Sequence, residues 1–160
     1  MTERERVYFF HGLESAPVGT KSLRLEEDFE VVAPDFQEMD IWERLDKADE
    51  VTEGMGDLMV VGSSYGGLLA ALLYSRRPER FRGYVLMAPA FYLDAADDIE
   101  RMPDNAIVIH GVDDEVVPIE SVREFCTAYG VEMREVDDDH RLHGSLDAMV
   151  RAVRQVLAGG

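Results

Sequence analysis

The segment from Leu58 to Tyr74 constrains the fold more than any other part of the chain. It begins with the apolar run Leu-Met-Val-Val, continues with Gly-Ser-Ser-Tyr-Gly and ends in a second apolar stretch. The short run is typical of a buried strand, and the stretch after the glycines has the character of a helix. Gly62 and Gly66 would let the strand and the helix approach closely around a strained turn. Within a strand, sharp turn and helix, the central Ser64 is a candidate nucleophile.

Short apolar strands alternate with helical segments along the whole chain. The apolar runs predict strands at Val7–Phe10, Val31–Ala33, Leu58–Val61, Tyr84–Met87, Ala106–His110 and Glu132–Val136. Apolar residues at helical spacing predict helices at Lys21–Phe29, Met39–Glu53, Tyr65–Ser75, Ile119–Tyr129 and Ser145–Leu157. Strands of nearly continuous Val, Ile, Leu and Met indicate a mainly parallel sheet with helices on both faces. We therefore predict a single doubly wound α/β domain over residues 1–160, with about six strands.

The connection between the fourth and fifth predicted strands is short. Residues 88–105 have room for one small helix around Asp94–Arg101, but not for a lid domain. We therefore expect a shallow site that is open to solvent.

The charge of the chain limits its partners. Its formal net charge at pH 7 is −17, with 33 acidic and 16 basic residues. Such a surface repels nucleic acid and anionic membranes, because binding either one requires that phosphates be neutralised. No apolar run is long enough to span a bilayer. An acidic, lysine-poor surface also suits a salt-adapted protein, in which salt screens the self-repulsion.

The cysteine content and the amino terminus indicate a cytoplasmic protein. Cys126 is the sole cysteine, so the chain cannot form an internal disulfide. The segment Met1–Arg6 is charged and contains no apolar region, which argues against a secretory signal. The sequence does not specify an oligomeric state.

Reactive residues follow several strands at the edge where an open parallel sheet binds its ligands. Ser64 follows the third strand, Asp113 and Asp114 follow the fifth, and His140 and His143 follow the last. A serine needs an imidazole to take its proton, and the imidazole needs a carboxylate to fix its tautomer. The order Ser, Asp, His is that of the α/β-hydrolase triad. We expect Ser64 to act with one of the two aspartates and one of the two histidines.

Two backbone amides are candidates for binding the oxyanion of a tetrahedral intermediate. One is the N–H of Tyr65 at the start of the helix after Ser64, and the other is the N–H of Leu13. Gly12 allows the tight turn that directs the Leu13 amide toward the serine. Phe91 and Tyr92 are candidates for lining an acyl pocket.

Other polar residues are expected to have structural roles. His11 and His110 precede glycines at strand ends and are predicted to be hydrogen-bonded supporting residues. The run Asp137–Asp139 is predicted to be a solvated turn, because three consecutive carboxylates rarely converge on one cation.

The chain resembles the small, lidless α/β-hydrolases of the YqiA-type esterase group. The matching features are Phe9–Leu13, then Ser15, Ala16, Pro17 and Lys21, the segment Val61–Gly67, the turn Asp114–Val116 and the late His140. The resemblance covers nearly the whole length. It implies an α/β-hydrolase fold and hydrolysis of a small-molecule ester or thioester through an acyl-enzyme, with no cofactor or metal. The pattern His-Gly-x-x-Asp-Glu-Val-Val-Pro favours Asp114 over Asp113. His140 is favoured over His143 because it lies nearer the strand end, although Asp138 stands where the family turn often carries glycine.

Two other functions are compatible with the same residues. Since fold alone does not determine function, the chain could be a binding protein that keeps the hydrolase fold without useful turnover. It could also be an acyltransferase that uses the same triad. The sequence does not specify the acyl or alcohol group of the substrate.

Overall fold

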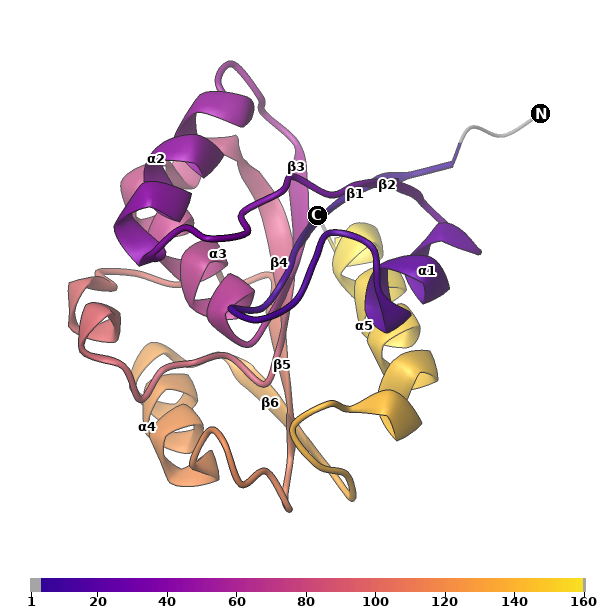
Figure 1. Cartoon of the computed structure of the whole chain (residues 1–160), viewed down its shortest axis with the longest axis vertical. Coiled ribbons are helices and arrows are strands. Elements are labelled where there is room, and N and C mark those ends of the chain that lie inside the picture. Colours follow the sequence, from indigo (N-terminus) through magenta and orange to yellow (C-terminus); the bar gives the residue numbers. More distant parts are fainter. Residues whose placement is uncertain (1–3, 160) are drawn as a thin grey trace.

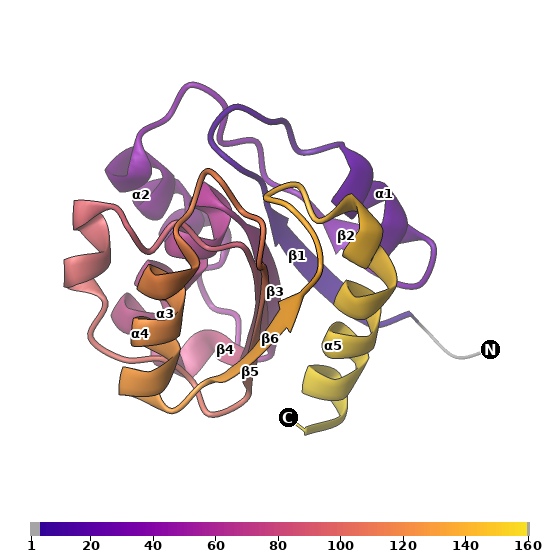
Figure 2. The ribbon, with the colours of Figure 1, turned by 90° about the horizontal axis from the view of Figure 1, so that it is seen from below.

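A parallel sheet runs through the centre of the molecule, and helices cover both of its faces (Figures 1 and 2). The computed structural model describes residues 4–159, so residues 1–3 of the charged amino terminus and residue 160 lie outside the described residues. Within residues 4–159 the sheet has six strands, in the spatial order β2-β1-β3-β4-β5-β6, and all neighbours are parallel. The strands are β1 (Arg6–Phe10), β2 (Glu30–Val32), β3 (Leu58–Ser63), β4 (Phe81–Met87), β5 (Ala106–Gly111) and β6 (Glu132–Val136). The prediction of a parallel sheet of about six strands is confirmed.

The helices form two layers, which divide the apolar core into two clusters. The helices are α1 (Thr20–Glu26), α2 (Ile41–Val51), α3 (Tyr65–Arg76), α4 (Ile119–Tyr129) and α5 (Leu146–Gly159). Figure 2 shows α1 and α5 on one face of the sheet and α2, α3 and α4 on the other. Alternate residues of each strand face opposite layers. Thus Phe10 belongs to the cluster under α2, α3 and α4, while Phe9 belongs to the cluster under α1 and α5.

The ends of the helices follow from local chemistry. Asp40 precedes α2, and its side chain accepts hydrogen bonds from the backbone of Trp42 and Glu43, at 3.0 and 2.9 Å. Such an N-cap satisfies amides that have no partner inside the helix. The helix therefore begins at Ile41, two residues after the predicted start at Met39.

The connection between β4 and β5 is short, as predicted. It contains one short 3-10 helix, η2 (Asp94–Asp98), and residues 4–159 contain no lid over the sheet. None of the helices in this part of the chain is long and apolar enough to cross a membrane.

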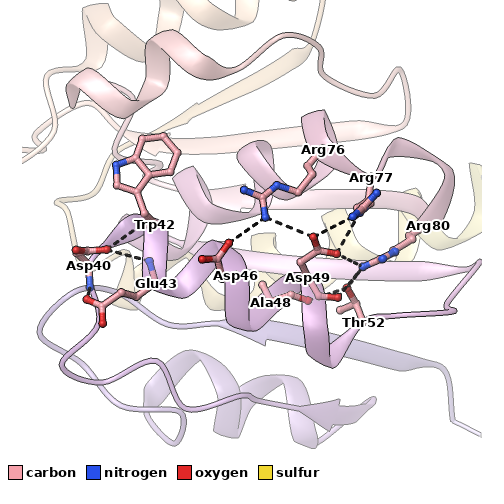
Figure 3. A network of polar contacts seen from close by, with 10 residues as sticks. All are labelled: Asp40, Trp42, Glu43, Asp46, Ala48, Asp49, Thr52, Arg76, Arg77 and Arg80. Carbon is pink, nitrogen blue, oxygen red and sulfur yellow. Dashed lines mark hydrogen bonds and ion pairs between the residues drawn. The ribbon is translucent and has the colours of Figure 1, made fainter.

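A network of ion pairs holds the end of α2 against the end of α3 (Figure 3). Arg76 and Arg77 contact Asp49, as does Arg80 of the 3-10 helix η1 (Pro78–Arg80). Arg80 also donates to the carbonyl oxygen of Asp49 at 2.8 Å and to the hydroxyl of Thr52 at 3.0 Å. Because Arg80 and Asp49 are largely buried, these contacts fix the position of α2 on the sheet more firmly than exposed pairs would.

Candidate active site

Ser64 lies in a strained turn between β3 and α3. Its backbone angles are φ 55° and ψ −110°, which a residue with a side chain rarely adopts. Backbone hydrogen bonds hold it there. The Ser64 N–H donates to the carbonyl of Met87 at 2.8 Å, and its own carbonyl accepts from the N–H of Ala90 at 3.0 Å. The strain is therefore supported by the segment that follows β4.

The glycines beside Ser64 allow the backbone to pack closely. A Cβ atom on Gly62 would lie 2.5 Å from the carbonyl oxygen of Gly66. A Cβ atom on Gly66 would collide with the carbonyl oxygen of Phe10 in β1. Only glycine fits at these two positions, so both motif glycines are required by the contact of α3 with β3 and β1.

A cavity of about 1020 Å³ opens at the turn that holds Ser64. Its walls come from the loop after β1 and the start of α1, the turn around Ser64, the segment after β4 and the loops after β5 and β6. This is the edge at which strands of an open α/β sheet bind ligands. Leu13, Ser64, Tyr65 and His140 all line it. With Tyr92 and His143, the structure thus brings six of the predicted site residues to one cavity.

His140 and Asp114 are hydrogen-bonded to each other. The distance from His140 Nδ1 to Asp114 Oδ2 is 2.8 Å, and the Asp114 side chain is fully buried. The other carboxylate oxygen accepts from the N–H groups of Val116 and Val117, at 2.8 and 2.7 Å. An imidazole that donates from Nδ1 keeps Nε2 as its acceptor. No hydrogen bond joins Ser64 to His140 within residues 4–159; such contacts are often long before substrate binds.

The alternative residues lie differently. The Asp113 side chain is exposed, and its backbone N–H donates to the carbonyl of Asp138 at 3.1 Å. His143 begins the 3-10 helix η3 (His143–Ser145), is exposed and also lines the cavity. The structure therefore pairs His140 with Asp114 and leaves Asp113 outside that contact.

His11 and His110 are both fully buried and hydrogen-bonded. His11 Nδ1 is 2.8 Å from the carbonyl of Gly12, and its Nε2 accepts from the N–H of Phe36 at 2.9 Å. His110 Nε2 is 3.0 Å from the carbonyl of Val117. Burial lowers the pKa of each imidazole below its ordinary value, which favours the neutral form.

Asp138 braces the loop that carries His140. Its carboxylate accepts hydrogen bonds from the hydroxyl of Ser145 at 2.8 Å and from the N–H groups of Gly144 and Asp139 at 3.0 and 2.8 Å. Burial alone would raise the pKa of this carboxyl, but these hydrogen bonds outweigh burial and leave the pKa lowered. Asp138 therefore supports the loop that carries His140, a role that the sequence pattern did not predict. In residues 4–159 no three His, Cys, Asp or Glu side chains are grouped to hold a metal ion.

The two aromatic residues after β4 have separate environments. Tyr92 is exposed and lines the cavity, whereas Phe91 is buried and packs on Phe125 with ring centroids 4.7 Å apart. Phe91 therefore belongs to the core under α4 and not to the cavity wall, because the chain turns its side chain inward there. Val18 and Val116, which the sequence analysis did not select for a pocket, are exposed and line the cavity.

The fold and this edge of the sheet define the class of protein, which is a hydrolase of the α/β superfamily. Comparison with known families gives the same class. Residues 25–106, just over half of the chain, match the family described as serine aminopeptidase, S33. The chain belongs to this family. The matched part contains Ser64 and ends before Asp114 and His140. The narrower likeness to YqiA-type esterases finds no separate support in the comparisons.

Solved structures support the superfamily. A protein of the α/β-hydrolase superfamily from Xanthomonas campestris pv. campestris is 26% identical, with a TM-score of 0.84 over 99% of this chain and 100% of the other. Est1E from Butyrivibrio proteoclasticus is 15% identical, with a TM-score of 0.79 over 98% of this chain and 88% of the other. A monoacylglycerol lipase from Paleococcus ferrophilus is 16% identical, with a TM-score of 0.74 over 96% of both chains. The last two show the fold alone. No curated protein matches the chain.

Proposed function

We propose that this chain is a serine hydrolase that cleaves carboxylic esters or thioesters through an acyl-enzyme intermediate. In this proposal Ser64 is the nucleophile, His140 is the general base and Asp114 orients His140. The observation that carries it is the 2.8 Å contact between His140 Nδ1 and Asp114 Oδ2 at the wall of a cavity that Ser64 also lines. A buried carboxylate in this position selects the tautomer that can accept a proton at Nε2.

The reaction would proceed in two halves. Ser64 Oγ forms a bond to the carbonyl carbon while its proton moves to His140 Nε2. The tetrahedral intermediate then collapses, and the alcohol or thiol leaves with that proton. A water molecule attacks the acyl-enzyme in the same way, which releases the acid and restores Ser64. The amides of Leu13 and Tyr65 would bind the oxyanion in both halves.

The rim of the cavity supports a substrate with an apolar acyl group. Leu13, Val18, Tyr92 and Val116 line the cavity and are each about half exposed or more, at 54, 68, 47 and 54%. Exposed apolar side chains that gather at one cavity mark a ligand surface. Because no lid covers this rim in residues 4–159, an acyl chain could lie along it partly open to solvent.

The test of the catalytic proposal is hydrolysis of p-nitrophenyl acetate by the wild type and by Ser64→Ala. The wild type should turn over the ester, and Ser64→Ala should lose that turnover while keeping the wild-type circular dichroism spectrum. Ser63→Ala is the matched control and should retain activity. Wild-type turnover by Ser64→Ala would refute the assignment.

The acyl-chain proposal is tested with p-nitrophenyl esters of two to twelve carbons. If the rim binds the acyl group, kcat/KM should rise from acetate to a medium chain, and Val18→Asp should remove most of the rise. An unchanged chain-length profile in Val18→Asp would show that the rim does not bind the acyl group.

A further inference from the structure

Arg44 is a fully buried arginine in α2 without a carboxylate partner. Its relative exposure is 0%, and within residues 4–159 no ion pair joins it to an Asp or Glu side chain; the exposed Asp35 carboxylate acts on its charge only from beyond ion-pair distance. Burial of a guanidinium without a counter-ion is costly, because the charge loses its hydration. The Arg44 charge is therefore compensated by other groups, and these lie beside the cavity that Ser64 lines.

Those groups are the carbonyl oxygens of His11 and Gly12 in the loop after β1, with a longer contact from Arg44 Nε to the carbonyl of Met39 at 3.4 Å. Arg44 Nη1 donates to the carbonyl of His11 at 2.6 Å, and Nη2 donates to the carbonyl of Gly12 at 2.9 Å. His11 Nδ1 reaches the same Gly12 carbonyl at 2.8 Å. These two donors at 2.9 Å or less hold the direction of the Gly12 carbonyl, and the N–H and hydroxyl of Ser15 add longer contacts to the same oxygen at 3.5 and 3.3 Å.

The Gly12 carbonyl belongs to the same peptide unit as the Leu13 N–H. A peptide unit is planar, and in the trans form its C=O and N–H point in opposite directions. Residues 4–159 contain no cis peptide. When Arg44 and His11 hold the carbonyl on the α2 side, the Leu13 N–H must point away from α2. Leu13 lines the cavity with Ser64.

Arg44 also contacts the second proposed oxyanion donor. Its guanidinium lies over the ring of Tyr65, 4.8 Å from the centroid, and over the ring of Phe36 at 5.6 Å. A stacked guanidinium restrains the residue that carries the ring. One side chain thus contacts the segments that supply both amides, Leu13 and Tyr65.

We infer that Arg44 is the positioning residue of the oxyanion hole: it orients the Gly12–Leu13 peptide unit and packs against Tyr65. This role rests on the proposed function. Hydrogen bonds to a carbonyl also polarise its peptide unit, which makes the Leu13 N–H a stronger donor. Arg44 itself touches neither Ser64 nor the reacting atoms.

The test compares Arg44→Met and Arg44→Lys with Arg80→Met. Arg80 is also a buried arginine, but it binds Asp49 and Thr52 at the far end of α2 (Figure 3) and does not line the cavity. In Arg44→Met we expect kcat for p-nitrophenyl acetate to fall by about 10- to 100-fold with little change in KM. Arg44→Lys should recover part of the loss, because one ammonium can still reach one carbonyl. Arg80→Met should keep kcat within about twofold.

A second measurement is independent of turnover. The heteronuclear ¹H–¹⁵N NOE of the Leu13 amide should fall in Arg44→Met, which indicates faster motion of this peptide unit, and should stay unchanged in Arg80→Met. A folded Arg44→Met with wild-type kcat and an unchanged Leu13 NOE would overturn the inference. If Arg44→Met does not fold, Arg44→Lys with wild-type values of both would overturn it. A wild-type protein without turnover would refute the proposed function instead, and the Leu13 NOE would still decide whether Arg44 holds the loop.

Discussion

Asp114 is the residue on which the candidate site depends most. One of its oxygens binds two backbone amides, and the other lies 2.8 Å from His140 Nδ1 and 3.3 Å from His110 Nε2. A carboxylate held by this many donors cannot rotate away from His140. The neighbouring Asp113 has an exposed side chain, although the two residues are adjacent in sequence.

We predict that Asp114→Asn lowers kcat on the order of 10³–10⁴-fold, because an amide nitrogen facing His140 would favour the wrong tautomer. Asp113→Asn is the matched control and should keep wild-type kcat. Both values follow from initial rates with a p-nitrophenyl ester. Equal losses of kcat in the two variants, or a loss in Asp113→Asn alone, would contradict the assignment of Asp114 as the carboxylate that orients His140.

The buried histidines predict how stability responds to pH. The pKa of His11 and of His110 is lowered by burial, so as pH falls the unfolded state takes up protons before the folded state does. The two neutral histidines therefore contribute fully to the free energy of unfolding above the ordinary imidazole pKa of about 6.5. This contribution is lost as pH falls below that value. The free energy of unfolding in urea should therefore decrease between about pH 7.5 and 5.5. His11→Gln should show a smaller decrease, and equal slopes for this variant and the wild type would contradict the prediction.

At the scale of elements, the position of α2 matters because this helix carries Arg44. Its far end is held by Asp49, whose pKa is lowered chiefly by the hydrogen bond from Arg77. Asp46 lies one turn earlier; within residues 4–159 its carboxylate forms an ion pair with Arg76 alone, and its side chain is 78% exposed. Both aspartates form ion pairs with arginines at the end of α3 (Figure 3), but the Asp49 side chain is far less exposed than that of Asp46.

We predict that Asp49→Asn lowers the free energy of unfolding by about 1–3 kcal/mol, because it leaves the largely buried Arg80 without its carboxylate. Asp46→Asn should change it by no more than about 0.5 kcal/mol. Urea unfolding of the two variants measures both values. A loss in Asp46→Asn that matches or exceeds the loss in Asp49→Asn would contradict this account of how α2 is held.

Sequence patterns predicted the elements well where apolar spacing and end signals agree. The helix Ile119–Tyr129 and the strand Glu132–Val136 have their predicted bounds, and Gly130 between them adopts a left-handed conformation, φ 68°, that suits glycine. The predicted strand Tyr84–Met87 begins earlier, at Phe81. Its first residues pair with β3 across an irregular register, which no local pattern reveals.

The candidate site was predictable only in part. The strand ends placed Ser64, Asp114 and His140 at one edge, but adjacent aspartates differ only in loop geometry, which spacing does not encode. Arg44 was missed because a helical arginine is normally solvated. Its two short hydrogen bonds go to backbone carbonyls more than thirty residues away, at His11 and Gly12. A hydrogen bond to a backbone carbonyl cannot be predicted from the types of residues in the sequence, because every residue has that carbonyl.

At the scale of the whole molecule, the net charge of −17 opposes compact folding through self-repulsion. Added salt screens such repulsion, since the Debye length falls from about 10 Å at 0.1 M to about 3 Å at 1 M. The arginine–carboxylate pairs would lose some strength at the same time, but exposed pairs contribute little to stability. The balance therefore favours a gain in stability with salt.

We predict that the melting temperature rises by about 5 °C or more between 10 mM and 1 M sodium chloride. Most of the rise in melting temperature should occur below about 0.3 M, because the screening of charges is nearly complete there. Stabilisation by salting-out would instead continue to grow with the salt concentration. A sucrose series controls for excluded-volume stabilisation. A flat response to salt, or a linear one up to several molar, would contradict screening as the cause.

The proposed function depends on the activation of Ser64 by His140. Labelling with a fluorophosphonate, followed by peptide mapping, tests it most directly, because only an activated serine reacts. We expect one label, on Ser64, in the wild type and in His143→Gln, and the loss of this label in His140→Gln. No label on Ser64, or an equal label on Ser64 in His140→Gln, would contradict the claim.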